Sequence, residues 1–175
     1  MKIFKRIAVA LGGCLIAAIL VLFLMGFRSN ANHLVATLVI GCPPAQLWTW
    51  IAEPEGQKRW ISWLTKIDQE DTGEFRWTMV DPTMNNRAVH IDGKRTAFQP
   101  PREFGAHIAS EGMFEGDISY RLKEAGENKT ALEYDFRYRY ETFFARLMEP
   151  LITPQAQKKL DGDLARLKQL AEQSN

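Results

Sequence analysis

Strict alternation of apolar and polar side chains over Thr130–Glu141 is the feature that most limits how this chain can fold. Because successive side chains of a strand point to opposite faces, the spacing predicts a long strand with one aromatic face and one solvated face. A single solvated face predicts an antiparallel sheet whose other face is covered by another part of the chain. The predicted inner face carries Leu132, Tyr134, Phe136, Tyr138 and Tyr140.

A helical pattern over Phe143–Ala171 provides a candidate for that cover. Leucines or alanine recur at three- and four-residue spacing on its second half, which predicts one apolar stripe on an otherwise charged helix. The stripe consists of Leu160, Leu164, Leu167 and Leu170 or Ala171. Pro150 and Pro154 each remove a backbone donor, so a kink or a break is expected there. We expect the stripe to pack on the aromatic strand face.

The middle of the chain reads as strands and turns with few helical residues. Short connections between consecutive strands predict an antiparallel meander. Asp92-Gly93 is a possible bulge or tight turn that would divide one of the strands. The predicted strands are His33–Ile40, Leu64–Glu70, Glu74–Val80, Arg87–Phe98, Arg102–Ser110 and Phe114–Leu122. A short helix is predicted over Ala45–Ala52, led by Pro44, and a second short helix or a turn over Glu55–Trp63.

An uncharged run, Ile7–Phe27, follows three basic residues at the start of the chain. About 20 apolar residues in a helix span a hydrocarbon core of about 30 Å, so the run predicts one transmembrane helix. Lys2, Lys5 and Arg6 outnumber Arg28, which predicts a cytoplasmic N-terminus and a domain on the extracytoplasmic side. The expected organisation is a membrane anchor over residues 1–28, a linker over 29–32 and one domain over 33–175.

Two other interpretations of the N-terminal segment remain open. A cleaved signal peptide fits the small residues Ser29–Ala31, although its apolar region is usually shorter than this run. Leu11–Cys14 (LGGC) resembles a lipoprotein cleavage box, but apolar residues continue to Met25 where a polar tether is typical. We therefore favour an uncleaved anchor.

Charge and cysteine content exclude several classes of protein. The formal net charge is +1, and basic and acidic residues alternate along the strands, so no basic face predicts a nucleic-acid partner. The two cysteines, Cys14 and Cys42, lie in segments that cannot plausibly meet, so no disulfide framework is expected. The chain is long enough to bury a core without metal or disulfides.

Several short segments together resemble the SRPBCC superfamily, which has the helix-grip fold. They are Val39–Trp48 with its proline-led helix, Trp60, Pro100-Pro101, Lys129-Thr130 and Leu164–Leu170, and the resemblance covers about His33 to Glu172. The superfamily includes START-type lipid carriers, birch-pollen-allergen-like proteins and polyketide cyclase/dehydrase-like domains. The resemblance implies an α+β fold with a curved antiparallel sheet around the last helix, and a cavity between them for an apolar ligand. The predicted membrane anchor departs from most members.

Residues that usually carry chemistry do not form a recognised motif in this chain. His33, His90 and His107 lack the spaced partners of a zinc site, and His90 with Asp92 is at most a two-ligand fragment. Nucleophile-elbow, Walker and dinucleotide-binding motifs are absent from the sequence. We therefore expect no metal or cofactor and assign no catalytic residue.

The inward tyrosines indicate either mutual hydrogen bonds or a cavity with polar groups, because burying an unpaired hydroxyl costs about 1–3 kcal/mol. Three functions follow: a membrane-anchored domain that binds a lipid or other hydrophobic small molecule, a polyketide cyclase/dehydrase-like enzyme, or a membrane-surface interaction module that exposes Trp60 and Trp63. The sequence favours the first. The candidate cavity residues are Trp77, Met79, Phe104, Ile108, Phe114, Ile118, Tyr120, Tyr134, Phe136, Tyr138, Leu160 and Leu164.

Overall fold

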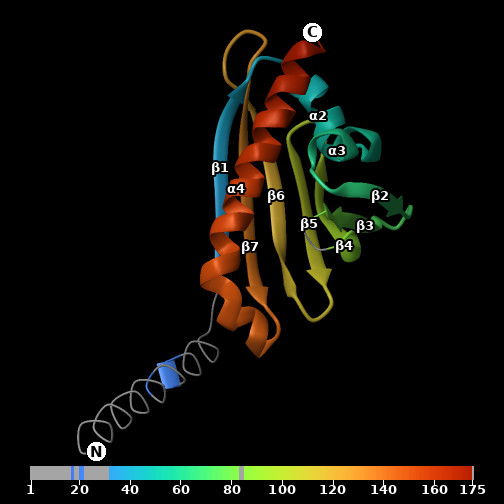
Figure 1. Cartoon of the computed structure of the whole chain (residues 1–175). Coiled ribbons are helices and arrows are strands. Elements are labelled where there is room, and N and C mark those ends of the chain that lie inside the picture. The colour runs from blue at the N-terminus through green and yellow to red at the C-terminus, as the bar shows by residue number, and fades with distance from the viewer. Residues whose placement is uncertain (1–16, 18–19, 22–31, 83–84, 175) are drawn as a thin grey trace, which may run out of the picture.

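The described part of the chain combines a curved sheet with three helices on one side of it (Figure 1). A computed structural model describes residues 17, 20–21, 32–82 and 85–174. The elements in chain order are β1 (Asn32–Ile40), α2 (Pro44–Ala52), α3 (Pro54–Trp60), β2 (Leu64–Gln69), β3 (Glu74–Asp81), β4 (Arg87–Gln99), β5 (Glu103–Ser110), β6 (Phe114–Glu124), β7 (Thr130–Tyr140) and α4 (Phe143–Gln173).

Seven antiparallel strands form the sheet in the order β1-β7-β6-β5-β4-β3-β2. Strands β2 to β7 follow one another as the predicted meander. The first strand does not join its sequence neighbour but pairs with β7, where Asn32 lies opposite Tyr138 and Ile40 opposite Thr130. The start of β1 therefore lies at the same end of the sheet as the end of β7.

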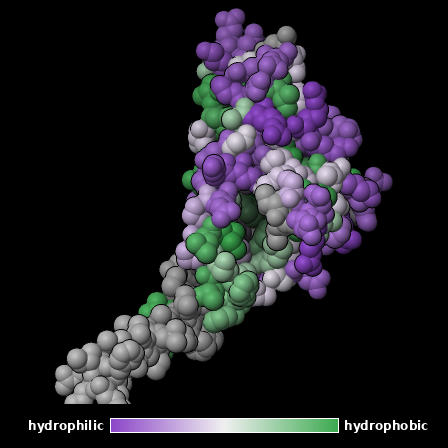
Figure 2. Space-filling view, in the orientation of Figure 1, coloured by the Kyte–Doolittle hydropathy of each residue, from purple (hydrophilic) through white to green (hydrophobic). Residues whose placement is uncertain are grey.

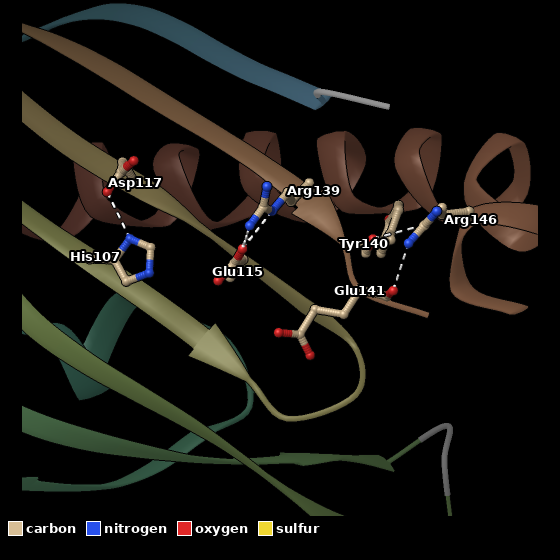
Figure 3. Close-up of polar contacts among 7 residues, drawn as sticks. All are labelled: His107, Glu115, Asp117, Arg139, Tyr140, Glu141 and Arg146. Atoms are coloured by element: carbon tan, nitrogen blue, oxygen red, sulfur yellow. Dashed lines mark hydrogen bonds and ion pairs between the residues drawn. The ribbon is translucent and has the colours of Figure 1, made fainter. Parts of the chain in front are cut away.

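The alternation in β7 separates a buried face from a solvated one, as the sequence predicts. Tyr134, Phe136 and Tyr138 are each less than a tenth exposed, whereas Arg137 and Arg139 are exposed. The solvated face carries cross-strand ion pairs with β6, such as Arg139 with Glu115 (Figure 3). The predicted antiparallel sheet with one covered face is confirmed.

Helix α4 supplies the cover and packs against β1, β7, α2 and α3. The buried residues on it are Leu160, Asp163, Leu164, Leu167 and Ala171. Its leucine stripe thus lies on the sheet side, and the arrangement is the α+β layout of a helix-grip fold. Because the buried residues begin at Leu160, the first half of α4 covers the sheet incompletely.

Of the two outcomes expected at the prolines of α4, a kink or a break, the break does not occur: the helix continues from Phe143 to Gln173, and its axis changes direction near its beginning (Figure 1). Strand β4 differs from the sequence prediction, because it is continuous through Gly93 and its irregularity falls between Arg95 and Ala97. Gly93 is required for another reason: a Cβ there would lie 2.2 Å from the ring of Phe75.

The predicted transmembrane segment Ile7–Phe27 falls outside the described residues, apart from residues 17, 20 and 21. The same holds for Cys14 and for the basic residues at the start of the chain. Within the ranges that the structure describes, no helix is long and apolar enough to cross a membrane. The anchor and its orientation therefore stay predictions.

Candidate ligand cavity

A cavity of about 300 Å³ lies between the inner face of the sheet and α4. Its walls come from β1, from β3 to β7, from α4, and from the end of α3 with the segment that joins it to β2. Three of the twenty lining residues are charged, and most of the others are aliphatic or aromatic. The lining residues are Leu34, Trp60, Ile61, Trp63, Trp77, Met79, Asp81, Val89, Ile91, Ile108, Met113, Phe114, Ile118, Tyr120, Tyr134, Phe136, Ala156, Lys159, Leu160 and Asp163.

Nine of the twelve residues chosen from the sequence border this cavity, and three do not. Phe104 is buried beside it, where its ring contacts Phe98 and Tyr120. Leu164 is buried on α4 one position beyond Asp163. Tyr138 lies towards the end of β7, and its Oη is buried without a hydrogen-bond partner. The nine that border it are Trp77, Met79, Ile108, Phe114, Ile118, Tyr120, Tyr134, Phe136 and Leu160.

Asp163 is the buried charged group of the cavity wall, with 5% of its surface exposed. Its carboxylate accepts a hydrogen bond from the backbone N–H of Ser62 at 3.0 Å and another from Lys159 Nζ, one turn earlier on α4. A buried carboxylate requires such partners because removing an unpaired charge from water is very costly. Asp163 therefore joins α4 to the turn between α3 and β2 and places a polar group at the edge of an apolar space.

The sequence prediction missed Asp163, although the pattern contains a sign of it. Asp163 follows Leu160 by three residues and precedes Leu167 by four, so it occupies a position of the apolar stripe. A charged residue at such a position is uncommon unless it is paired. Its partner Ser62 lies about a hundred residues earlier in the chain, and no local pattern indicates that contact.

Tyr120 and Tyr134 form an aromatic part of the cavity wall near Asp163. They are register partners on β6 and β7, and their ring centroids are 5.2 Å apart in an edge-to-face arrangement. Burial raises the pKa of Tyr134 well above its ordinary value, and the neighbouring Tyr120 raises it further. The pKa of Tyr120 is raised mainly by burial and further by the negative charge of Asp163. Both phenols are therefore neutral hydrogen-bond donors at neutral pH.

The two tryptophans at the α3–β2 connection have different environments. Trp60 is 2% exposed and donates its indole N–H to the carbonyl of Trp50 at 2.8 Å, so it is a core residue. This contradicts the hypothesis that Trp60 and Trp63 are both exposed contacts. Trp63 is 37% exposed and borders the cavity. Its φ of 69° is uncommon for a bulky residue, and Lys159 Nζ lies 5.1 Å from its ring centroid.

A wider hollow of about 880 Å³ lies at the outer side of the sheet and is bordered by charged residues of β2, β3 and β4. Several of these charges pair with one another, as Arg76 does with Asp92 and Lys94 with Glu74. His107, at its edge, pairs with Asp117 at 2.9 Å (Figure 3). Paired surface charges describe a solvated sheet face, so we assign the candidate site to the smaller apolar cavity.

Metal ligation finds no support in the part of the chain that the structure describes. No group of three or more histidine, cysteine, aspartate or glutamate side chains there could hold a metal ion. The sequence-derived fragment His90 and Asp92 is divided between different partners: the His90 ring contacts Thr78 Oγ1, whereas Asp92 binds Arg76.

Sequence comparison resolves the family. Residues 32–172 match the family described as polyketide cyclase/dehydrase and lipid transport, which is most of the chain. The chain belongs to this family. A comparison with curated protein sequences found no match.

Solved structures share the fold of this chain at low sequence identity. A conserved protein from Geobacillus kaustophilus has a TM-score of 0.70 at 9% identity, over 82% of this chain and 97% of that one. The ZhuI aromatase/cyclase from Streptomyces sp. R1128 has a TM-score of 0.68 at 13% identity, over 82% and 94%. A protein from Deinococcus radiodurans has a TM-score of 0.59 at 20% identity, over 82% and 100%. At these identities the likeness shows the fold alone.

Proposed function

We propose that this chain is a membrane-anchored domain that binds one hydrophobic small molecule between its sheet and α4. The cavity of about 300 Å³ with its apolar lining carries the proposal. Ligand sites usually measure about 300–1,000 Å³ and combine apolar walls with a few polar groups. The volume lies at the small end of that range, which favours a single-chain or ring-shaped guest over a two-chain lipid.

Polar groups at one side of the cavity indicate the chemistry of such a guest. Asp163 accepts hydrogen bonds, and the neutral phenols of Tyr120 and Tyr134 donate them. A guest with an apolar body and one hydroxyl or carbonyl group would satisfy both kinds of partner. The proposed ligand is therefore amphipathic, with its polar end directed at Asp163.

Anchoring by Ile7–Phe27 completes the proposal. The run is apolar over a length that matches a bilayer, and the basic residues Lys2, Lys5 and Arg6 precede it. We propose an N-terminus on the cytoplasmic side and the domain on the other side. Extraction of membranes with alkaline carbonate tests the anchor, since an integral protein stays with the lipid, and protection of the domain from external protease tests the orientation.

The test of ligand binding uses Ala156, which faces the cavity from α4. Ala156→Phe fills the space, so we expect its affinity for a fluorescent polyene fatty acid to fall about tenfold or more, or ~1.4 kcal/mol. The neighbouring Gln155 is exposed, and Gln155→Phe is the matched control that keeps wild-type affinity. Native mass spectrometry of the purified chain identifies any guest that it retains. Equal loss of affinity in both variants, or in neither, would place the guest elsewhere.

Acid–base catalysis on the same guest is a second candidate function, and Asp163 is the observation that favours it. A buried carboxylate beside two phenols is a plausible donor and acceptor set for proton transfer. The raised pKa values keep both phenols protonated, so they would donate hydrogen bonds to the guest while Asp163 carries the proton transfer. Loss of turnover in Asp163→Asn at unchanged guest affinity would support catalysis, and unchanged turnover would exclude this role.

A further inference from the structure

The first half of α4 exposes several large apolar side chains. Phe144 is 69% exposed and Leu151 61%, and these residues are seven apart, so they lie on one side of the helix. Phe143, Ile152 and, in the β5–β6 turn, Met113 are also more than a third exposed. These five residues are called the docking patch below. Clustered apolar exposure of this kind marks a surface that contacts a membrane or another molecule.

Local hydrogen bonds hold the docking patch together. The N–H of Glu141 donates to the carbonyl of Met113 at 3.1 Å, and the carboxylate of Glu141 accepts from the N–H of Gly112. The Arg146 guanidinium, in the second turn of α4, donates to the carbonyls of Tyr140 and Glu141 (Figure 3). The β5–β6 turn and the start of α4 thus form one unit. Figure 2 shows apolar side chains gathered over this end of the domain.

The docking patch borders the ligand cavity. Met113 is both exposed and part of the cavity wall, and Phe114 beside it is part of that wall as well. Asp81 and Val89, at the β3–β4 end that faces the same way, also line the cavity. Because no residue of α4 before Leu160 is buried, this is the end at which the cavity is least covered.

The chain enters the domain at this end too. Asn32 opens β1 opposite Tyr138, two residues before β7 ends and five before α4 begins. Four residues, 28–31, separate the apolar run Ile7–Phe27 from Asn32. The five steps from Phe27 to Asn32 reach at most about 18 Å when fully extended. A chain anchored through that run therefore keeps the patch end of the domain close to the lipid surface.

We propose that the docking patch inserts into the interfacial layer of the bilayer that anchors the chain, so that the cavity opens onto lipid. This rests on the anchoring in the proposed function. Helices that lie in the interface bury their apolar face about 5–10 Å deep. The side chains that would insert are apolar, and the nearby Arg146 is occupied with backbone carbonyls, so burial of apolar area drives the contact. The guest then exchanges with the bilayer without crossing water.

Depth measurements on the full chain test this docking. The variants Phe144→Cys and Leu151→Cys, each made with Cys14→Ala, carry an environment-sensitive fluorophore on the new cysteine in phosphatidylcholine vesicles that contain a spin-labelled lipid. Cys42 is fully buried, and burial raises its pKa, so it does not react. Glu127→Cys, on the exposed β6–β7 loop, is the matched control. We expect lipid-dependent quenching of about twofold or more at positions 144 and 151 and none at 127.

Each other outcome overturns the docking. Flotation in a density gradient reports whether the chain stays with the vesicles. If it does, but the labels at positions 144 and 151 are quenched no more than the label at 127, the anchor stands and the docking fails. If the chain does not float, the anchoring and the docking fail together, while ligand binding is judged separately by the Ala156 variants. If the fluorescence of the label at 144 changes with protein concentration and not with lipid, a second copy of the chain covers the patch. Phe144→Glu with Leu151→Glu should retain flotation and folding but abolish quenching at a label placed at Met113→Cys.

Discussion

Asp163 serves two purposes at once, because the bonds that make its burial tolerable also shape the cavity. Its carboxylate receives the N–H of Ser62, next to Trp63, whose left-handed backbone turns the indole towards the cavity. The polar end of the site and the position of Trp63 therefore depend on one side chain. Substitutions at Asp163 of different size and polarity can separate these two contributions.

Replacing Asp163 tests this dual role. Asp163→Ala leaves the N–H of Ser62 without an acceptor, so we expect the free energy of unfolding to fall by about 1–3 kcal/mol in urea denaturation. Asp163→Asn keeps a carbonyl oxygen for Ser62 and should lose less. Asp161→Asn, on the exposed side of the same helix and bonded to Gln157, is the control and should have little effect. Equal losses for Ala and Asn would show that the Ser62 bond contributes little.

Tyr138 gives the opposite expectation. Its hydroxyl neighbours that of Tyr140, but no contact of Tyr138 Oη has the geometry of a hydrogen bond. Because an unpaired buried hydroxyl costs free energy, Tyr138→Phe should raise the free energy of unfolding by ~1 kcal/mol. Tyr134→Phe, whose ring borders the cavity, is the comparison and should bring no such gain. A clear loss of stability in Tyr138→Phe would mean that the hydroxyl has a partner in solution.

At the scale of elements, strands β6 and β7 carry all four tyrosines of the chain, and each of these residues is buried. This concentration was predictable from the alternation in β7, because a period of two fixes which side chains share a face. The pairing of β1 with β7 was not predictable in the same way. Both strands are apolar and alternate, and residues 41–129 lie between them, so no local pattern selects the partner.

The buried tyrosines make the domain sensitive to base. Burial raises the pKa of Tyr120, Tyr134 and Tyr140 above the ordinary value of 10. Below pH 10 these tyrosines are protonated in both the folded and the unfolded chain. Above pH 10 the exposed tyrosines of the unfolded chain ionise, which stabilises the unfolded state, so the free energy of unfolding falls as pH rises. We expect the phenolate absorbance of the folded chain near pH 11 to stay well below that of the chain in denaturant. Equal absorbance in a still-folded chain would contradict the burial.

At the scale of the molecule, the end of α4 returns to the first strand. Glu172 accepts the N–H of Gly41 at 2.8 Å and pairs with Lys168 at 3.0 Å. Lys168 in turn donates to the carbonyl of Val39. These contacts attach the last turn of the helix to the β1–α2 connection, so the two ends of the domain stabilise each other.

Acid should weaken this attachment. The pKa of Glu172 lies below its ordinary value of 4.5, mainly because of the hydrogen bond from Gly41 and further because of the contact with Lys168. The contribution of Glu172 is therefore present above pH 4.5 and is lost as pH falls through the lowered pKa. Glu172→Ala should lower the melting temperature at pH 7 and converge with wild type at the acid end. Glu127→Ala, on an exposed loop, is the control, and a constant difference across pH would contradict the mechanism.

Particular residues show how far the sequence predicted the whole molecule. The alternation in β7 and the leucine stripe of α4 predicted the two facing surfaces. Together with the alternation in β3, β5 and β6 they predicted nine of the cavity residues, because all of these patterns follow from local periodicity. Ser62, Trp63 and Val89 were missed since their positions depend on how distant segments meet. Trp60 shows a related limit: composition alone does not separate a buried indole from an exposed one, and the Trp50 carbonyl that accepts its N–H is ten residues away.

The edge pairing of β1 with β7 also has a consequence for the order in which the protein forms. During synthesis β1 leaves the ribosome first, and its partner follows only after the five intervening strands have been made. Until then its hydrogen-bonding groups are satisfied by solvent or by a chaperone, and closing so long a loop makes this a late and slow event. A nascent chain stalled before Thr130 should therefore leave residues 32–40 open to protease, and release of β7 should protect them.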